Sequence, residues 1–204
     1  MAELTMKELS ERLTKIESIL DGTWEVKVPI ELASNDQMPI YAHPTDAGAD
    51  LIANKDFVLR LGESVIVPTG VKMAIPVGFE VQIRPRSGIS AKTTIRESNS
   101  PGTIDTGYRD DIGVILYNDP NPVVSFKNPD APVVYVDGSV VPDEDIKKYI
   151  HDDIAHKGTV IIRKGDRIAQ MVLAKSCKAK FVVVDSVAEI GENRNGGFGH
   201  TGVN

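Results

Sequence analysis

The chain opens on an apolar repeat that predicts an amphipathic helix over residues 6–20. Thr5 and Glu8 fit a capping box at its start, and Gly22 fits its stop. A lone helix of this length is marginal in water, so its apolar stripe must pack against something. Two predictions stay open: docking on the chain's own domain, or a short coiled coil between subunits. The stripe has the a/d spacing of a heptad and consists of Met6, Leu9, Leu13, Ile16 and Leu20.

After Trp24 the pattern changes to short runs rich in β-branched residues, separated by Gly, Pro and Asn. Proline presets φ and glycine allows positive φ, so the separators are expected to be turns. Many short strands between turns predict an all-β fold, either a sandwich or a barrel. The expected strands are Val26–Leu32, Phe57–Leu61, Ser64–Val67, Val71–Ile75, Phe79–Ile83, Ile112–Tyr117, Thr159–Ile162, Ile168–Leu173 and Phe181–Val184.

Residues 119–157 interrupt this pattern. A strong hairpin signal, Asp137-Gly138, lies between two apolar runs. One apolar helical face follows over Asp143–Lys157, with Asp143 as the expected cap and Gly158 as the expected stop. We therefore divide the chain into a helix over 1–22, a β-domain over 23–190 with an exposed inserted arm at 119–157, and a flexible C-terminal arm over 191–204.

Composition and charge limit the partners of this chain. Its 204 residues are 41% hydrophobic and 25% charged, which is typical of a globular protein. A net charge of −6 disfavours nucleic acid and acidic membrane surfaces as partners. No apolar run approaches the roughly 20 residues of a membrane span, and the acidic N-terminus does not resemble a secretory signal, so we expect a cytoplasmic protein. Cys177 is the only cysteine, which excludes an internal disulfide.

Five glycine-bearing turns each stand next to an acid, an arginine or an aromatic residue. Glycine lets backbone N–H groups approach an anion closely. Because the chain is itself acidic, an anionic ligand must be held by local arginines, such N–H groups and a metal ion. The fourth turn leads into a strand with Gln170, although its Asp166 and Arg167 also fit a simple turn with an ion pair. The turns cover residues 46–51, 84–88, 99–108, 165–170 and 196–202.

Three of these turns offer groups for chemistry on a phosphorylated ring compound. Asp105 lies in the third turn, where a carboxylate can take a proton from water; alternatively, it only caps the turn. Arg86, Ser87 and Gly88 offer contacts to an oxyanion; alternatively, Arg86 is solvated at a strand end. Phe198 in the last turn can close over a ring, or it belongs to a disordered tail. The four histidines show no metal-ligand spacing with one another or with the cysteine.

Taken together and in this order, the five turns resemble the motifs of the dUTPase family, the deoxyuridine triphosphate nucleotidohydrolases of the homotrimeric all-β type. The resemblance covers the chain from about Val26 to Gly202, apart from 119–157. It implies a distorted jelly-roll (β-clip) subunit and a homotrimer with active sites shared between subunits. It also implies Mg²⁺-assisted hydrolysis of dUTP to dUMP and pyrophosphate, which limits uracil in DNA and supplies dUMP for dTTP synthesis.

The resemblance implies a role for each site residue. Asp105 orients and deprotonates the water that attacks the α-phosphorus, and Asp50 supports the site, at most through water. With Gln170, these are the implied catalytic residues. Mg²⁺ is held mainly by substrate phosphates and water, without a protein ligand. The implied substrate contacts are Arg86, Ser87, Gly88 and Gln170 to phosphate oxygens, Asn99, Gly102, Thr103 and Ile104 to uracil, Tyr108 to deoxyribose, Phe198 and Gly199 in the closing arm, and Arg194 to the terminal phosphates.

Two alternatives stay open at this point. A dCTP deaminase of related fold would need a glutamate general base and a tryptophan in place of Tyr108. A regulator switched by dUTP would bind a protein partner through the 119–157 insertion. That insertion is similar to extra arms in some bacteriophage members of the family. It suggests a phage or prophage origin, which would make the host cytoplasm the location.

Overall fold

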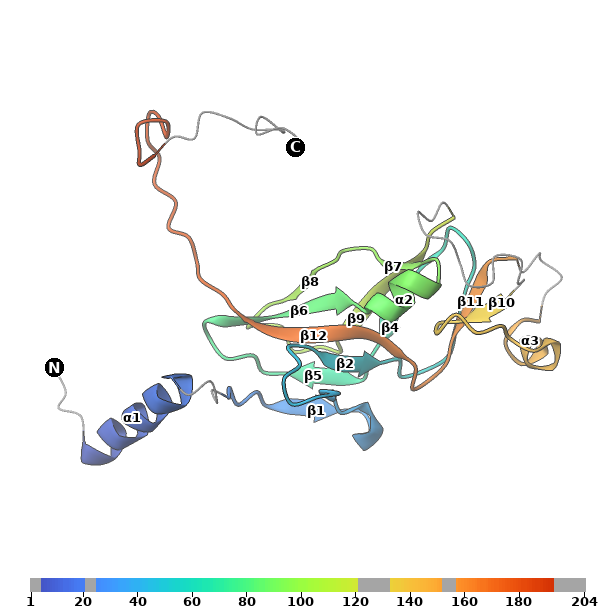
Figure 1. The fold of residues 1–204 in the computed structure, drawn as a ribbon, viewed down its shortest axis with the longest axis horizontal. Coiled ribbons are helices and arrows are strands. Elements are labelled where there is room, and N and C mark those ends of the chain that lie inside the picture. The colour runs from blue at the N-terminus through green and yellow to red at the C-terminus, as the bar shows by residue number, and fades with distance from the viewer. Residues whose placement is uncertain (1–4, 21–24, 121–132, 152–156, 193–204) are drawn as a thin grey trace.

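The computed structural model describes residues 5–20, 25–120, 133–151 and 157–192, and it is built mainly of short strands (Figure 1). This confirms the predicted all-β fold class. Its elements are α1 (Met6–Leu20), β1 (Ile30–Leu32), η1 (Asn35–Gln37), β2 (Ala49–Ile52), β3 (Phe57–Leu59), β4 (Ser64–Pro68), β5 (Val71–Met73), β6 (Phe79–Pro85), α2 (Ser87–Lys92), β7 (Ile95–Glu97), β8 (Gly102–Ile104), β9 (Gly113–Asn118), β10 (Val133–Tyr135), α3 (Asp143–Tyr149), β11 (Thr159–Ile162) and β12 (Arg167–Lys175).

The sheet that carries most of the site has the strand order β2-β12-β6-β8. All of its pairs are antiparallel, and β12 is central. Its register places Gln170 opposite Asp50 on one side and opposite Arg84 on the other. The other sheets among the described residues have the orders β4-β9-β7, β10-β11-β3 and β1-β5.

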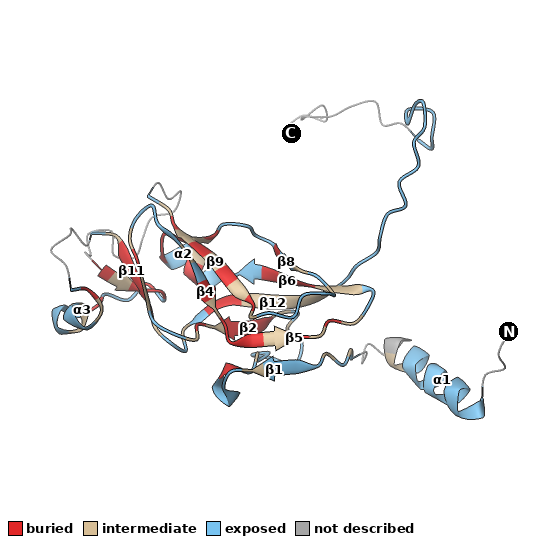
Figure 2. Ribbon diagram, turned by 180° about the vertical axis from the view of Figure 1, so that it is seen from behind, coloured by how far each residue is buried: buried red, intermediate tan, exposed pale blue. Residues whose placement is uncertain are grey.

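The apolar core lies between these sheets, and the strands of the main body contain most of the buried residues (Figure 2). In β9, inward and outward positions alternate, so Val114 and Leu116 are buried and their neighbours are less so. In β11 all four residues are buried, because both faces of that strand are covered. Burial of one such Val, Leu or Ile side chain contributes about 1.5–3 kcal/mol to folding.

Several elements of the body are not predicted by the pattern of apolar and polar residues. β2 is buried on both faces and therefore shows no alternation of apolar and polar residues. β7 and β8 have three residues each, too short for a periodicity. α2 has six residues and begins with Ser87-Gly88, which are poor helix formers. Conversely, only the last part of the expected strand 26–32 pairs, as β1 with β5.

The expected strand Phe181–Val184 is not formed within this chain. The described residues from Lys175 to Glu192 are all exposed and extend away from the body (Figures 1 and 2). Phe181 is 93% and Val183 is 98% exposed. A strand needs a partner for its backbone N–H and C=O groups, and the described part of the chain supplies none here. Among the described helices, none has the length and apolar character that crossing a membrane would require.

The N-terminal helix forms as predicted but does not dock on the body. The capping box is confirmed: the Thr5 N–H donates to the Glu8 carboxylate at 2.8 Å, and the Glu8 N–H donates to Thr5 Oγ1 at 3.3 Å. The Thr5 N–H and the Thr5 hydroxyl both donate to the Glu8 carboxylate and lower the pKa of Glu8. However, every residue from Thr5 to Glu17 is exposed, and α1 stands apart in both views (Figures 1 and 2). Packing against the chain's own domain is therefore not observed.

The described part of the insertion is a packed lobe rather than a free arm. β10 pairs parallel with β11, and the tight turn at Asp137-Gly138 is confirmed by a bond from the Gly138 N–H to the Tyr135 carbonyl at 2.8 Å. A second apolar cluster joins the lobe to the β11-β3 sheet. The helix is shorter than predicted, because α3 ends at Tyr149 and the backbone of Ile150 is extended. Its cap position is Pro142 instead of Asp143. Residues 152–156 lie outside the described residues.

Candidate active site

A buried carboxylate, Asp50, lies at the centre of the candidate site. It belongs to β2 and is 7% exposed. Arg86 donates from Nε and Nη2 to the two carboxylate oxygens, at 2.9 and 3.3 Å. Arg167 donates from Nη1 at 3.3 Å, and Gln170 from Nε2 at 3.2 Å. Two guanidinium groups share one carboxylate, so the cluster has a net positive charge that suits a phosphate group.

The chain turns from a strand into a short helix at Arg86, which is the N-cap residue of α2. The carbonyl of Arg86 closes the first turn by accepting the N–H of Ser90 at 3.1 Å. The first N–H groups of a helix have no partner inside the helix. Ser87 and Gly88 are exposed at this position, so their N–H groups and the Ser87 hydroxyl can bind the oxygens of an anion next to the Arg86 guanidinium.

A pocket of about 390 Å³ opens beside these groups. Its volume is within the range of small-molecule sites. It joins α2, the turn before β12 and the hairpin of the inserted lobe, so segments far apart in sequence meet there. Its lining residues are Arg86, Gly88, Ile89, Lys92, Val136, Asp137, Gly165, Asp166 and Arg167.

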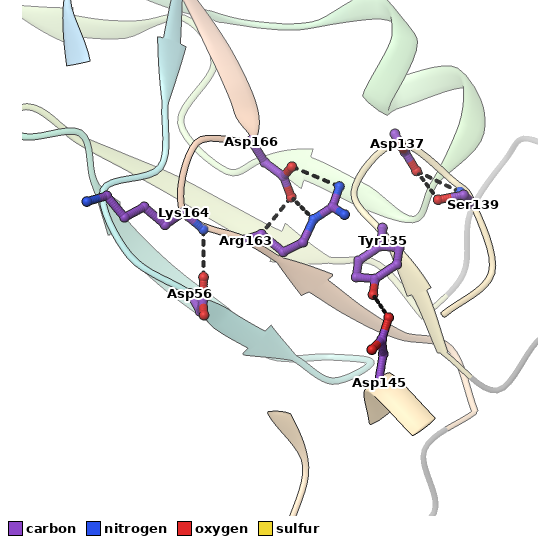
Figure 3. Close-up of polar contacts among 8 residues, drawn as sticks. All are labelled: Asp56, Tyr135, Asp137, Ser139, Asp145, Arg163, Lys164 and Asp166. Carbon is purple, nitrogen blue, oxygen red and sulfur yellow. Dashed lines mark hydrogen bonds and ion pairs between the residues drawn. The ribbon is translucent and has the colours of Figure 1, made fainter. Parts of the chain in front are cut away.

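The turn that carries Arg167 is held by its neighbour Arg163. Asp166 accepts bonds from the N–H, Nη2 and Nε of Arg163 at 2.8, 3.1 and 3.3 Å. The Arg163 guanidinium also lies 4.0 Å from the ring centroid of Tyr135, whose hydroxyl donates to Asp145 of α3 at 3.1 Å (Figure 3). The ion pair of Asp166 is thus made by Arg163 and not by Arg167. This network connects the inserted lobe to the turn that carries Arg167, next to the Asp50 cluster.

The predicted ring-reading segment begins as an edge strand. β8 pairs with β6 and forms the edge of its sheet, where backbone groups are available to a ligand. Gly102 is buried, and a Cβ there would lie 3.2 Å from Asn99 Nδ2 and 3.4 Å from Glu97 Oε1. Glycine at this position therefore lets both side chains pack against the strand. Thr103 and Asn99 are exposed and Ile104 is half-buried.

Asp105 and Tyr108 lie on the turn that follows β8. The Tyr108 N–H donates to the Asp105 carbonyl at 3.0 Å, so the backbone of Asp105 closes the turn. The Thr106 hydroxyl donates to the Phe79 carbonyl at 2.9 Å and anchors the turn to β6. The Tyr108 hydroxyl donates to the Asp111 carbonyl at 2.9 Å, which fixes a ring that is still 38% exposed. The side chain of Asp105 is exposed, as a group that receives a proton from water must be.

Within one chain, the Asp50 cluster and the turn that carries Asp105 are far apart. Ile104 of β8 pairs with Val81 of β6, and Asp105 is the next residue after Ile104. Asp50 of β2 pairs with Gln170 of β12, which in turn pairs with Arg84 of β6, so Asp50 lies at the level of Arg84. From the level of Asp105 to that of Arg84 is roughly 13 Å along β6, and β8 and β2 are separated by three strand spacings, roughly 14 Å. The backbones of Asp105 and Asp50 are therefore about 20 Å apart. A single subunit does not bring them to the same reacting atom.

Sequence reasoning missed one titratable residue, Glu97. It ends β7, is 9% exposed, and lies next to Gly102 in the ring-reading segment. Burial raises its pKa to about 7, and the backbone N–H of Gly102 opposes this rise in part. Among the described residues, neither oxygen has a hydrogen bond of good geometry. β7 has only three residues, Ile95-Arg96-Glu97, which is too short for a periodic signal from which the burial of Glu97 could be predicted.

Three predicted contacts, Arg194, Phe198 and Gly199, lie outside the described residues. Over the ranges that the structure describes, no group of three or more His, Cys, Asp or Glu could hold a metal ion. Mg²⁺ usually keeps several waters and is bound by one or two carboxylates together with substrate phosphates, and the exposed Asp105 offers one such carboxylate.

Comparisons with known proteins identify the family to which this chain is similar. The model of the dUTPase family matches residues 34–130 and 139–202. The deoxyuridine 5'-triphosphate nucleotidohydrolase of Chlamydia pneumoniae is 39% identical over 175 residues, covering 84% of this chain and 95% of its own. That of Thermobifida fusca is 37% identical over 165 residues, covering 81% and 72%. A dUTPase of Staphylococcus bacteriophage 80alpha, solved with dUpNHpp, has a TM-score of 0.73 at 27% identity and covers 88% of this chain and 100% of its own.

Fold and site thus define a nucleotide hydrolase with a β-clip fold. The family match extends over most of the chain and over both halves of the site, and the relatives are matched over most of their own length. The chain belongs to the dUTPase family. Its activity is the hydrolysis of dUTP, as a dUTP diphosphatase of nucleotide metabolism. This decides against the dCTP deaminase alternative.

Proposed function

We propose that dUTP is hydrolysed at sites shared between the subunits of a homotrimer. The observation that carries this proposal is the distance of about 20 Å between Asp105 and Asp50 in one chain, estimated from strand register and spacing. A neighbouring copy would place its phosphate-binding residues against the ring-reading edge of the first. The exposed apolar segment Phe181–Val184 supports the same assembly, because a second copy would supply the strand partner that it lacks.

In the proposed site, one subunit reads the nucleoside. Asn99 and the edge backbone of Gly102, Thr103 and Ile104 bind uracil, and the Tyr108 ring packs against the deoxyribose. A donor and acceptor pattern fixed by a sheet edge rejects a mismatched base, because the mismatch would leave buried polar groups unpaired. Asp105 takes the proton of the water that attacks the α-phosphorus, and the P–O bond to the pyrophosphate breaks.

A second subunit binds the phosphates. Arg86 uses two of its five N–H donors on Asp50, which fixes the guanidinium and leaves donors for phosphate oxygens. Ser87, Gly88 and Gln170 add hydroxyl, backbone and amide contacts. Asp50 is engaged by three side chains, so we assign it a supporting role rather than direct contact with the substrate. Arg194, Phe198 and Gly199 would close over the bound nucleotide.

We further propose Mg²⁺ as the cofactor. A mutant dUTPase of phage phi11, 27% identical with a TM-score of 0.64, is described as coordinating a structural Mg(II) ion. Mg²⁺ on the triphosphate would offset negative charge that this acidic chain cannot offset alone. The residues of the chain then orient the substrate and move the proton.

Complementation between inactive variants tests the shared site. Asp105→Asn removes the base, and Arg86→Ala removes a phosphate contact, so each variant alone should be inactive. In mixed trimers, some sites combine an intact Asp105 from one subunit with an intact Arg86 from its neighbour. Random 1:1 assembly by co-refolding should restore about a quarter of wild-type activity, the share of sites that draw both intact halves. A mixture that stays inactive, although sedimentation shows mixed trimers, would refute a shared site.

We propose that the 119–157 insertion contacts a neighbouring subunit or another protein. Phage dUTPases similar to this chain are described as controlling transfer of virulence genes by a G protein-like mechanism. Here one face of α3 packs on the lobe, whereas Asp143, Glu144, Lys147 and Lys148 are exposed and accessible to a partner. Deletion of the insertion with unchanged assembly and unchanged partner binding would count against this role.

The exposed thiol of Cys177 fits a reducing compartment such as the cytoplasm.

A further inference from the structure

The N-terminal helix presents an apolar stripe that no described residue of its own chain covers. α1 has 15 residues. Met6 is 81% exposed, Leu9 43%, Leu13 52% and Ile16 52%. An isolated helix of this length is marginal even with good helix formers, and exposed apolar stripes of this kind mark interaction surfaces. The capping box stabilises only the start of the helix, so a partner must stabilise the rest.

The charges beside the stripe match a second copy of the same helix. With Met6 and Leu13 at a positions and Leu9 and Ile16 at d positions, Arg12 is a g residue and Glu17 the e residue of the next heptad. In a parallel, in-register coiled coil, g and the following e' face each other, so Arg12 of one helix meets Glu17 of the next. In an antiparallel pair, g positions face g′ and e positions face e′, so like charges oppose each other. The sequence therefore complements itself only in the parallel arrangement.

The apolar positions also indicate the number of helices. Leu13 at a with Ile16 at d shifts the preference from dimers towards trimers or tetramers. A parallel arrangement is also the one that rotational symmetry imposes on three identical subunits. Residues 21–29 connect α1 to β1, and a chain of that length spans at most roughly 30 Å when extended.

We propose that the α1 helices of three subunits form a parallel, in-register coiled coil beside the β-domains; the proposal rests on the homotrimer inferred above. Tethering by 21–29 raises the effective concentration of the three helices to about the millimolar range, which suffices for a coiled coil too short to form from free peptides. The helix thereby adds an inter-subunit contact that is separate from the active-site residues.

Disulfide trapping in the full-length chain tests the contact directly. In a Cys177→Ser background, Leu9→Cys places a thiol in the seam, and Glu11→Cys places one at an f position on the outer face. Mild oxidation of dilute protein should convert most of the Leu9→Cys chains to disulfide-linked dimers and few of the Glu11→Cys chains. Equal yields for the two variants, or no dimer from Leu9→Cys, would overturn the proposal.

Charge reversal tests the register. Arg12→Glu and Glu17→Arg each replace three attractive contacts by repulsive ones, so each should slow disulfide trapping at Leu9→Cys by roughly tenfold. The double reversal restores opposite charges and should restore the trapping rate; failure to do so refutes the register. Sedimentation of the untrapped chain separates the two proposals. A trimer without trapping refutes only the coiled coil, whereas a monomer refutes the shared active site as well.

Discussion

Replacing Glu97 by glutamine should make the protein more stable, and increasingly so as the pH rises. The buried carboxyl has its pKa raised from 4.5 to about 7, and burial is the main cause. Below pH 4.5 the group is protonated in both the folded and the unfolded chain, so it costs nothing. Between pH 4.5 and about 7 the unfolded chain ionises first, and the free energy of unfolding falls as the pH rises.

The size of the effect follows from the shift. A rise of this extent corresponds to roughly 3 kcal/mol of lost stability once the pH exceeds 7, because one pKa unit is about 1.4 kcal/mol. Glu97→Gln keeps the shape of the side chain but cannot ionise, so the penalty disappears. At pH 8 the variant should be more stable than the wild type by up to about 3 kcal/mol, and the difference should vanish near pH 4.5.

Urea denaturation at a fixed subunit concentration, repeated from pH 5 to pH 8, measures this difference. Fixed concentration matters because assembly contributes to apparent stability. Glu25→Gln is the matched control, since it removes a carboxylate from an exposed position. If wild type and Glu97→Gln show parallel curves over this range, the carboxyl is not held in a water-poor site and the reasoning is refuted.

Three further outcomes are expected. Asp105→Asn should lower kcat for dUTP by about 10²–10⁴-fold while calorimetric dUTP affinity changes little, because the amide cannot accept the proton; near-normal turnover would remove Asp105 as the base. Chelation of Mg²⁺ should suppress pyrophosphate release and added Mg²⁺ should restore it, whereas an unaffected rate would contradict the cofactor assignment. Leu116→Ala leaves a cavity where a side chain that is 2% exposed has been removed, so the free energy of unfolding measured in urea should fall by about 2–5 kcal/mol. A change within experimental error would mean that the core closes around the cavity.

Local patterns in the sequence predict local structure well in this chain. The heptad spacing and the Thr5–Glu8 capping box predict α1 correctly, and both halves of the box form. Asp137-Gly138 correctly predicts a tight turn. Longer strands such as β4, β6 and β12 coincide with β-branched runs. These features depend on neighbours within a few residues, which is why the sequence is sufficient for them.

The candidate site is predictable to a smaller extent. Glycine turns and their neighbours identify Arg86, Asp105 and Gln170 as residues of interest. They do not reveal that Asp50 binds two arginines, because those contacts join residues up to 117 positions apart. Nor do they reveal that Arg163, rather than Arg167, pairs with Asp166. Such choices depend on strand register and side-chain direction, which a linear pattern does not contain.

The sequence by itself determined the fold class, the family motifs and the surfaces that need partners, because periodicity, turn chemistry and charge are properties of neighbouring residues. Only the tertiary structure decided which motifs meet. It brought Asp50, Arg86 and Gln170 together across adjacent strands and placed Asp105 at the far end of the same sheet. It also buried Glu97 without a good hydrogen bond and left α1 uncovered. Distance and desolvation arise only when the strands pair, so they follow from the fold and not from the order of residues.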